Sequence, residues 1–276
     1  MKPKAVKKSA TKYILIALAV LFIAVMLAVP LATVLVYALR QGWDTFAAAI
    51  VDPYAIKALK LTLTAAGTTV VLNTFFGVFA SWAITKFRFR GKQILTTLID
   101  IPFAISPVIA GLVFIYVFGR IGWAYPFLQA HDIKIVFAVP GIILATIFVT
   151  FPFISRELIP LMQSSGTDEE EAAALMGAGG LRIYRKITFP HVKWGLLYGI
   201  ILCTARAVGE FGAVSVVSGH LRGKTNTLPL HIEILFSEFH LTASFAVSSI
   251  LVAMTVVILV LRNIVEYRVK REERSH

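Results

Sequence analysis

Long stretches without charge alternate with short polar segments along the chain. Four stretches contain no acidic or basic residue, and two more are interrupted only by Asp100 and by Arg206 with Glu210. Each stretch is longer than the roughly 20 residues that a helix needs to cross about 30 Å of hydrocarbon. The pattern predicts an all-α membrane protein. Its six transmembrane helices are expected at residues 14–39, 61–85, 94–118, 135–155, 195–218 and 243–261.

The first uncharged stretch could belong to a signal peptide, because several lysines precede it. Its apolar run is longer than the roughly 7–15 residues of a cleavable core, and no clear small-x-small cleavage site ends it. We therefore expect a retained anchor helix. The single cysteine, Cys203, leaves no second cysteine in the chain for an intrachain disulfide.

The distribution of charge predicts an orientation. A net charge of +12 would suggest a nucleic-acid partner in a soluble protein. With the N-terminus placed in the cytoplasm, however, most of the 27 lysine and arginine residues fall in cytoplasmic tails and loops. This asymmetry is the positive-inside pattern of membrane proteins. We therefore expect both termini in the cytoplasm and no nucleic-acid partner.

Prolines in the apolar stretches predict bends. Pro102 and Pro107 lie in the third stretch, and Pro140 and Pro152 lie at the ends of the fourth. A proline lacks a backbone donor and disfavours the helical conformation of the residue before it. Kinks are expected at these positions.

The segment between the fourth and fifth spans, residues 156–193, is too long for a passive connector. Thr167 lies three residues before Glu170, as in a capping box. The acidic run 168–171 falls where a helix dipole is positive. A short helix is therefore expected to begin at this point, on the cytoplasmic side.

The rest of this loop predicts a second short helix. Residues 179–180 are glycines that would end the first helix, and residues 181–188 form a further helical segment that would end before Pro190. An apolar face on the first helix is predicted by helical spacing. Its members are Ala172, Leu175 and Met176.

The same loop resembles the coupling motif of binding-protein-dependent ABC importers. The family pattern is E-A-A, three residues, Gly, nine residues and I-x-L-P, and this chain departs from it only in having Phe189 for leucine. The matching residues are Glu171, Ala172, Ala173, Gly177, Ile187 and Pro190. The alternative is an amphipathic surface helix that binds no partner.

Small side chains give this resemblance a physical basis, because they let a short helix approach the groove of a partner closely. Carboxylates at the helix start can add charge-assisted contacts. The resemblance implies a type I ABC importer permease fold and a separate ATPase dimer that binds ATP and Mg and pushes on this loop. The chain itself is then expected to bind no cofactor or metal and to be no enzyme.

A second resemblance covers nearly all of the chain from about Lys57 onward. Residues 205–239 are similar to the W-type permeases of sulfate/thiosulfate importers, although residues 205–213 are also similar to molybdate permeases. The resemblance implies a homologous T-type permease, a periplasmic sulfate-binding protein and the bacterial inner membrane. A molybdate/tungstate permease and an ion-coupled anion carrier remain alternatives.

A Gly-Lys-Thr triplet within residues 218–227 raises the question of a nucleotide site on this chain. A phosphate-binding loop needs four residues between its two glycines, but only three separate Gly219 from Gly223. We interpret the segment as part of an outer loop, at which docking of a binding protein is plausible.

Charged residues in the fifth span are candidates for the substrate pathway. Arg206 and Glu210 are four residues apart, so they can pair on one helix face. They either neutralise each other and pack two helices together, or Arg206 lines the anion route and Glu210 prevents too tight binding. Proton coupling by the pair is a lesser alternative. Ser215 and Ser218 are candidate hydroxyl donors to the anion.

Three regions are expected in the chain. Residues 1–56 comprise a cytoplasmic tail, the first span and an outer loop. Residues 57–262 form the permease domain, with the coupling loop at 156–193. Residues 263–276 form a basic cytoplasmic tail.

In the third span, Asp100 is expected to cap backbone groups freed by the prolines or to touch the pathway.

Overall fold

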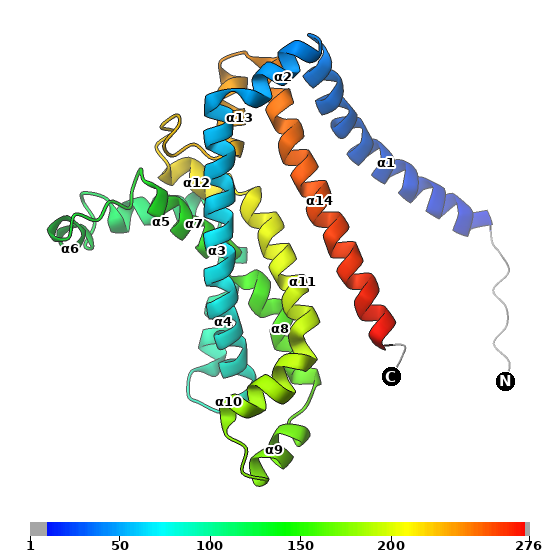
Figure 1. Ribbon diagram of the computed structural model, residues 1–276, viewed down its shortest axis with the longest axis vertical. Helices are drawn as coiled ribbons and strands as arrows, with labels where there is room; N and C mark the ends of the chain where they lie inside the picture. The colour runs from blue at the N-terminus through cyan, green and yellow to red at the C-terminus, as the bar shows by residue number, and fades with distance from the viewer. Residues whose placement is uncertain (1–9, 274–276) are drawn as a thin grey trace.

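The computed structural model describes residues 10–273, so the ends of both predicted tails lie outside the described residues. The described part is built from helices (Figure 1). The helices are α1 (Ala10–Leu39), α2 (Trp43–Val51), α3 (Pro53–Lys86), α4 (Lys92–Ala104), α5 (Pro107–Phe118), α6 (Tyr125–Ala130), α7 (Val139–Thr150), α8 (Pro152–Ser164), α9 (Asp168–Leu175), α10 (Gly180–Ile183), the π-helical segment Tyr184–Thr188, α11 (Phe189–Val208), α12 (Gly212–Val217), α13 (Leu228–Ser237) and α14 (Leu241–Glu273).

Four of the expected spans are present as long apolar helices. Within the described residues, these helices are long and apolar enough to cross a membrane: Lys12–Leu39, Pro53–Lys86, Val139–Ser164 and Leu241–Arg268. The second begins earlier than expected, because Asp52 caps it: its Oδ1 accepts hydrogen bonds from the backbone N–H groups of Tyr54 and Ala55, at 2.8 and 3.1 Å. Pro53 fits at the first helical position, where no donor is needed.

The stretch that was expected to form the third span is divided between α4 and α5. Helices α4 and α5 meet at an angle of 110°, and the described part contains five candidate spans if this pair counts as one. Ser106 has extended backbone angles (φ −58°, ψ 132°), as expected before Pro107. The predicted bend at Pro107 is confirmed, and Pro102 lies inside α4.

The fourth and fifth expected spans show two different effects of helix breakers. Phe151 keeps helical angles (φ −54°, ψ −41°), so α7 and α8 form one span through Pro152. Residues 195–218, by contrast, are divided between α11 and α12, because α11 ends at Gly209. One unbroken helix over this range is therefore wrong.

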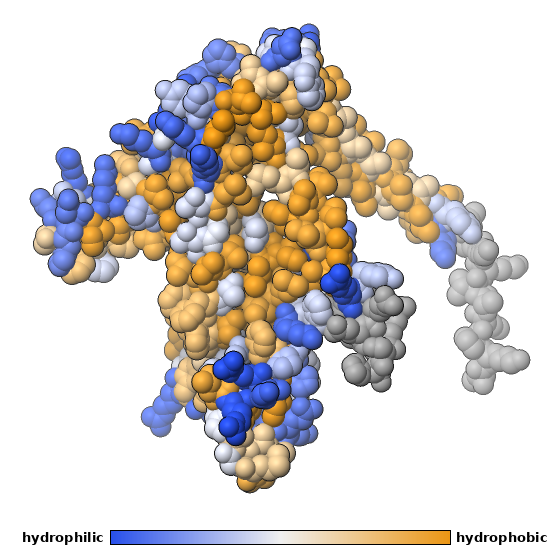
Figure 2. Space-filling model, in the orientation of Figure 1, coloured by the Kyte–Doolittle hydropathy of each residue, from blue (hydrophilic) through white to orange (hydrophobic). Residues whose placement is uncertain are grey.

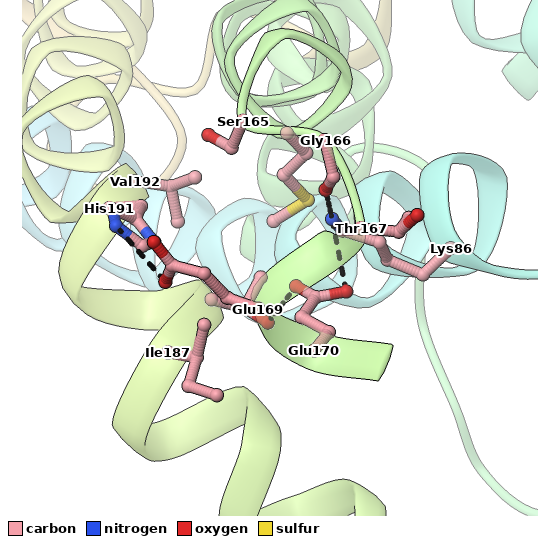
Figure 3. A pocket seen from close by; sticks show the side chains of 11 residues that line it. Lys86, Ser165, Gly166, Thr167, Glu169, Glu170, Ile187, His191 and Val192 are labelled. Atoms are coloured by element: carbon pink, nitrogen blue, oxygen red, sulfur yellow. Dashed lines mark hydrogen bonds and ion pairs between the residues drawn. The ribbon is translucent and has the colours of Figure 1, made fainter. Parts of the chain in front are cut away.

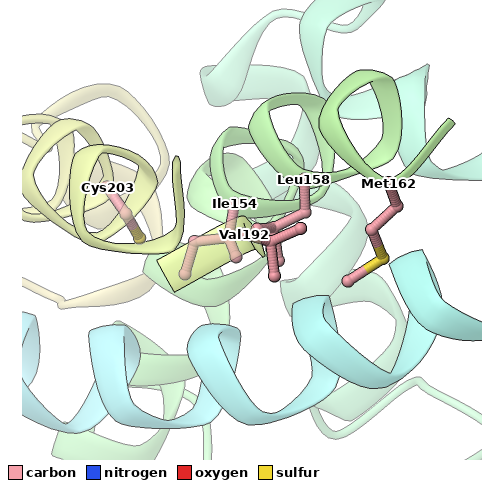
Figure 4. Close-up of a cluster of buried hydrophobic side chains, with 5 residues drawn as sticks. All are labelled: Ile154, Leu158, Met162, Val192 and Cys203. Carbon is pink, nitrogen blue, oxygen red and sulfur yellow. The ribbon is translucent and has the colours of Figure 1, made fainter. Parts of the chain in front are cut away.

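The bundle is organised around α3, which packs against α7, α8 and α11. One core cluster lies between α8 and α11 and consists of Ile154, Leu158, Met162, Val192 and Cys203 (Figure 4). Small residues allow this close packing: a Cβ on Gly195 would lie 2.0 Å from Leu161 Cδ1, and one on Gly199 would lie 3.3 Å from Ile154 Cα. Gly199 in particular lets α11 approach the backbone of α8 closely.

Apolar side chains cover the outside of the bundle. Figure 2 shows them across the middle of the molecule, with hydrophilic residues gathered toward its ends. Helix α1 stands apart from the bundle except where it contacts α14 and α2 (Figure 1). Its exposed apolar residues suit hydrocarbon rather than water.

Candidate functional site

The coupling loop forms one end of the molecule, beyond the ends of α3 and α8 (Figure 1). Helix α9 holds Glu171, Ala172 and Ala173, and Gly177 follows its end with a left-handed φ of +84°. Glycine adopts this conformation without the penalty that other residues incur. The helix therefore ends at Leu175, with Met176 as its C-cap, before the glycines at 179–180 that were expected to end it.

The start of α9 differs from the predicted capping box. Thr167 Oγ1 donates to Glu171 Oε1 (2.8 Å), while Glu170 contacts Lys86 and Thr188. The capping box is therefore wrong, because a lysine on another helix attracts the carboxylate that would complete it. The spacing of residues within the loop could not predict this contact, because Lys86 lies outside the loop, at the end of α3.

Helix α9 directs most of its apolar surface outward. Leu175 and Met176 are 90% and 82% exposed, and Leu181 of α10 is also exposed. Ala173 is the buried residue of α9. The predicted apolar face thus exists, and it faces away from the bundle.

The second predicted helix does not end before Pro190. Helix α10 passes through the π-helical segment directly into α11, and the Phe189 N–H donates to the carbonyl of Tyr184. Pro190 lies in the first turn of α11, where its missing donor costs little.

Tyr184, in the π-helical segment, packs against α3: its ring centroid lies 4.9 Å from that of Trp82. Burial raises the pKa of the Tyr184 hydroxyl.

A small pocket lies between α9 and the start of α11, with Ile187, Thr188, His191 and Glu169 among the residues that line it (Figure 3). Of the six residues matched to the coupling motif, Ile187 contributes to this pocket. Glu171, Ala172, Gly177 and Pro190 are exposed, while Ala173 is buried.

The predicted ion pair in the fifth stretch is present. Arg206 Nη2 lies 2.6 Å from Glu210 Oε2, and the two side chains are 32% and 1% exposed. They do not share one helix face, because α11 ends between them. Glu210 Oε1 accepts a hydrogen bond from the Ala213 N–H at 2.9 Å, so the carboxylate also stabilises the start of α12.

The two candidate serines interact with nearby backbone. Ser215 Oγ donates to the carbonyl of Gly212 (2.9 Å), and buried Ser218 accepts from the N–H of His220 (3.2 Å). These contacts provide local turns and do not point to an anion. Their place in the pathway stays a prediction.

Asp100 has a partner that sequence reasoning missed. Its carboxylate lies 2.8 Å from Arg156 Nε on α8, and the Arg156 guanidinium lies 4.3 Å from the ring of Phe103. Asp100 therefore joins α4 to α8 through an ion pair with Arg156. The only available signal was the opposite charge of two residues 56 positions apart.

The loop that contains the Gly-Lys-Thr triplet, between α12 and α13, packs against the first third of α3. Thr225 Oγ1 accepts from the Leu221 N–H, and Thr62 Oγ1 accepts from the Leu228 N–H at 2.7 Å. Thr225 and Leu228 are buried. The loop thus covers the end of the bundle opposite α9.

Comparison with known proteins identifies the family. Residues 73–271 match the family described as binding-protein-dependent transport system inner membrane component. The chain belongs to this family. It is therefore a multi-pass membrane protein of ABC transport systems, in which the family members are permease subunits without an ATPase site of their own.

Individual relatives agree with this assignment. The chain is 45% identical to the sulfate transport system permease protein CysW of Synechococcus elongatus, over 98% of this chain and 94% of the relative. It is 32% identical to the sulfate transport system permease protein CysT of Salmonella typhimurium, over 93% and 92%. The chain is thus a CysW-like ABC permease.

A solved structure supports the fold. A bacterial alginate ABC transporter in complex with an alginate pentasaccharide-bound periplasmic protein contains a chain that matches this one with a TM-score of 0.79. The match has 17% identity and covers 94% of each chain. The all-helical fold is therefore that of type I ABC permeases.

Proposed function

We propose that this chain is the permease subunit of an ATP-driven sulfate/thiosulfate importer and forms half of the translocation pathway. Its similarity to CysW, higher than to CysT, supports the W-type role and a T-type permease as the other half. A periplasmic sulfate-binding protein would deliver the anion. The complex would reside in the bacterial inner membrane.

The observation that carries the ATP-driven part of the proposal is the exposed apolar end of α9. Leu175 and Met176 project from a helix of small residues, next to a glycine turn, at one end of the molecule. Such a surface is costly in water unless a partner covers it. A separate ATPase dimer, with ATP and Mg bound to it, would supply the groove.

A six-span topology with cytoplasmic termini fits this arrangement. The pair α4–α5 would form the third span and α11–α12 the fifth. Breaks in transmembrane helices are tolerated where protein or a wet cavity surrounds the freed backbone. The break at Glu210 would then lie beside the pathway, within the proposed permease domain 57–262.

Arg206 is the residue that we propose to meet the anion. Its side chain is one-third exposed, whereas the Glu210 side chain that pairs with it is buried. A partly neutralised cation can attract a dianion without holding it, as a conduit requires. Ser215 and Ser218 would contribute less, because both already interact with neighbouring backbone.

The proposal is tested by uptake of radiolabelled sulfate into vesicles that contain this chain with its T-type and ATPase partners and the binding protein. Uptake should require ATP and all partners and should persist when a protonophore abolishes the proton gradient. Uptake driven by the gradient alone would contradict the proposal and favour an ion-coupled carrier. Competition by unlabelled molybdate but not by thiosulfate would favour a molybdate/tungstate permease.

A further inference from the structure

A contact between the coupling loop and α3 carries a further inference, which rests on the proposed function. The chain itself connects the loop to α8 on one side and to α11 on the other. Helix α3 ends at Lys86, far earlier in the sequence. A contact between α9 and α3 therefore adds a third helix to those that the loop can move.

The contact is made by Lys86, Gly166 and Glu170 (Figure 3), with Thr188 as its fourth member. We call it the Lys86–Glu170 clasp. Lys86 Nζ lies 3.0 Å from Glu170 Oε2 and donates to the carbonyl of Gly166 at 2.7 Å. The other oxygen, Glu170 Oε1, accepts from Thr188 Oγ1 at 2.6 Å. Both carboxylate oxygens are therefore held, one from α3 and one from the segment that leads into α11.

The clasp is sheltered from solvent. The Lys86 and Glu170 side chains are 8% and 17% exposed. Water screens such a pair much less than it screens ion pairs on an open surface. Separation of Lys86 from Glu170 would leave each charge poorly solvated. This cost adds to their mutual attraction and keeps the two side chains together.

Apolar packing does little to orient α9. Its main contacts are with α10 and the π-helical segment, and its buried residue is Ala173. A buried alanine contributes little surface compared with the exposed Leu175 and Met176. The polar clasp is thus the sheltered contact that orients α9 relative to the membrane helices, since the approach of Glu169 to His191 is longer, at 3.8 Å, and largely exposed.

Helix α3 is well placed to carry a displacement. It contains 34 residues, which corresponds to about 50 Å at 1.5 Å per residue. It packs against α7, α8 and α11, and against α13 at the opposite end. The ring contact of Trp82 with Tyr184 already joins α3 to the π-helical segment, and the clasp extends this connection to α9.

We propose that Lys86 and Glu170 are positioning residues that hold α9 against α3 and transmit its movement to that helix. ATP-driven displacement of α9 then moves three membrane helices together. Without the clasp, the ATPase still docks on the exposed face of α9. Its ATP-driven movement then displaces the loop but is only partly transmitted to α3.

Neutral variants of the clasp test this role in the complete transport complex. The variants are Lys86→Met, Glu170→Gln and the double variant, and Glu169→Gln is the matched control. Glu169 is the adjacent carboxylate on the same helix and is mainly exposed, with His191 Nε2 at 3.8 Å. Two quantities are compared: the amount of ATPase that copurifies, and the sulfate transported per ATP hydrolysed.

We expect Lys86→Met and Glu170→Gln to retain ATPase copurification within twofold and to lower sulfate per ATP at least fivefold. The double variant should be no worse than either single variant, because all three remove the same contact. Glu169→Gln should behave as wild type. Unchanged sulfate per ATP in Glu170→Gln would overturn the transmission role, as would equal losses in Glu169→Gln.

Hydrogen exchange in the isolated chain separates this inference from the proposed function. Glu170→Gln should accelerate exchange of the amides in α9 at least fivefold relative to Glu169→Gln, with no ATPase present. Equal exchange would show that the clasp does not hold α9 and would overturn the inference. A wild-type complex that transports sulfate without ATP would refute the proposed function, and the transmission role with it, whatever the exchange shows.

Discussion

The two ends of this molecule use their polar and apolar residues in opposite ways. At the α13 end, the loop that follows α12 is folded back on the bundle, and Thr225, Asn226 and Leu228 are buried. At the other end, α9 leaves Leu175 and Met176 almost fully exposed. The loop after α12 is thus packed against its own bundle, whereas α9 leaves apolar side chains uncovered in a single chain. That difference indicates where a partner subunit is needed.

The largest expected effect follows from filling the glycine turn after α9. Gly177→Trp should abolish copurification of the ATPase and leave the chain inserted in the membrane. A side chain at Gly177 would enter open space, so the bundle is spared, but it would obstruct docking and strain a left-handed residue. Copurification on an affinity tag, together with a membrane fraction assay, measures both.

Gly42→Trp is the matched control for that variant. Gly42 also has a left-handed φ (+95°), open space around its Cβ position and a place at the opposite end of the chain's fold. It should retain the ATPase. Equal loss in both variants would show that strain, rather than docking, is being measured.

The next effect concerns Arg206 and Glu210, between the two ends. Arg206→Ala leaves the buried Glu210 carboxylate without its cation, which costs about 3–5 kcal/mol. Arg206→Ala should therefore reduce assembly of the transport complex. The double variant Arg206→Ala/Glu210→Gln removes the unpaired charge and should restore assembly. Sulfate uptake should remain low in the double variant, because the cation that meets the anion is missing. Restored uptake would support a pair that only packs helices.

A smaller effect is expected at the α13 end. Thr62→Val removes the buried acceptor of the Leu228 N–H and should lower the free energy of unfolding by about 1–3 kcal/mol. Thr64→Val, on the same helix, is the control, because exposed Thr64 bonds only to the carbonyl of Lys60 one turn away. Unfolding in detergent distinguishes them. ATPase copurification should be unchanged in both, and a loss of it in Thr62→Val would contradict the independence of the two ends.

The sequence patterns predicted the long helices better than the breaks between them. Uncharged stretches sufficed for α1, α3, α14 and the α7–α8 span, because length and composition determine whether a helix can cross a membrane. Pro107 located the bend between α4 and α5, but its 110° angle depends on what the two helices pack against. The end of α11 at Gly209 was missed because a glycine in an apolar helix more often packs than terminates.

In the candidate site, too, the sequence predicted local features but not long-range contacts. Local motifs marked the residues of α9 and the charged pair Arg206–Glu210. Partners on distant helices, such as Lys86 for Glu170 and Arg156 for Asp100, could not be found, since opposite charges alone do not reveal which side chains meet. These tertiary contacts also redirected Glu170 from its predicted place in a capping box.

Site-specific photocrosslinking tests the central claim, that the exposed end of α9 is held by a separate ATPase, most directly. A photoreactive amino acid at Leu175 should form a covalent adduct with the ATPase subunit in the assembled complex, identified by mass spectrometry. The same amino acid at Phe239, which is also strongly exposed but lies between α13 and α14 at the opposite end of the molecule, should form no such adduct. An ATPase adduct at 239, or none at 175, would contradict the account.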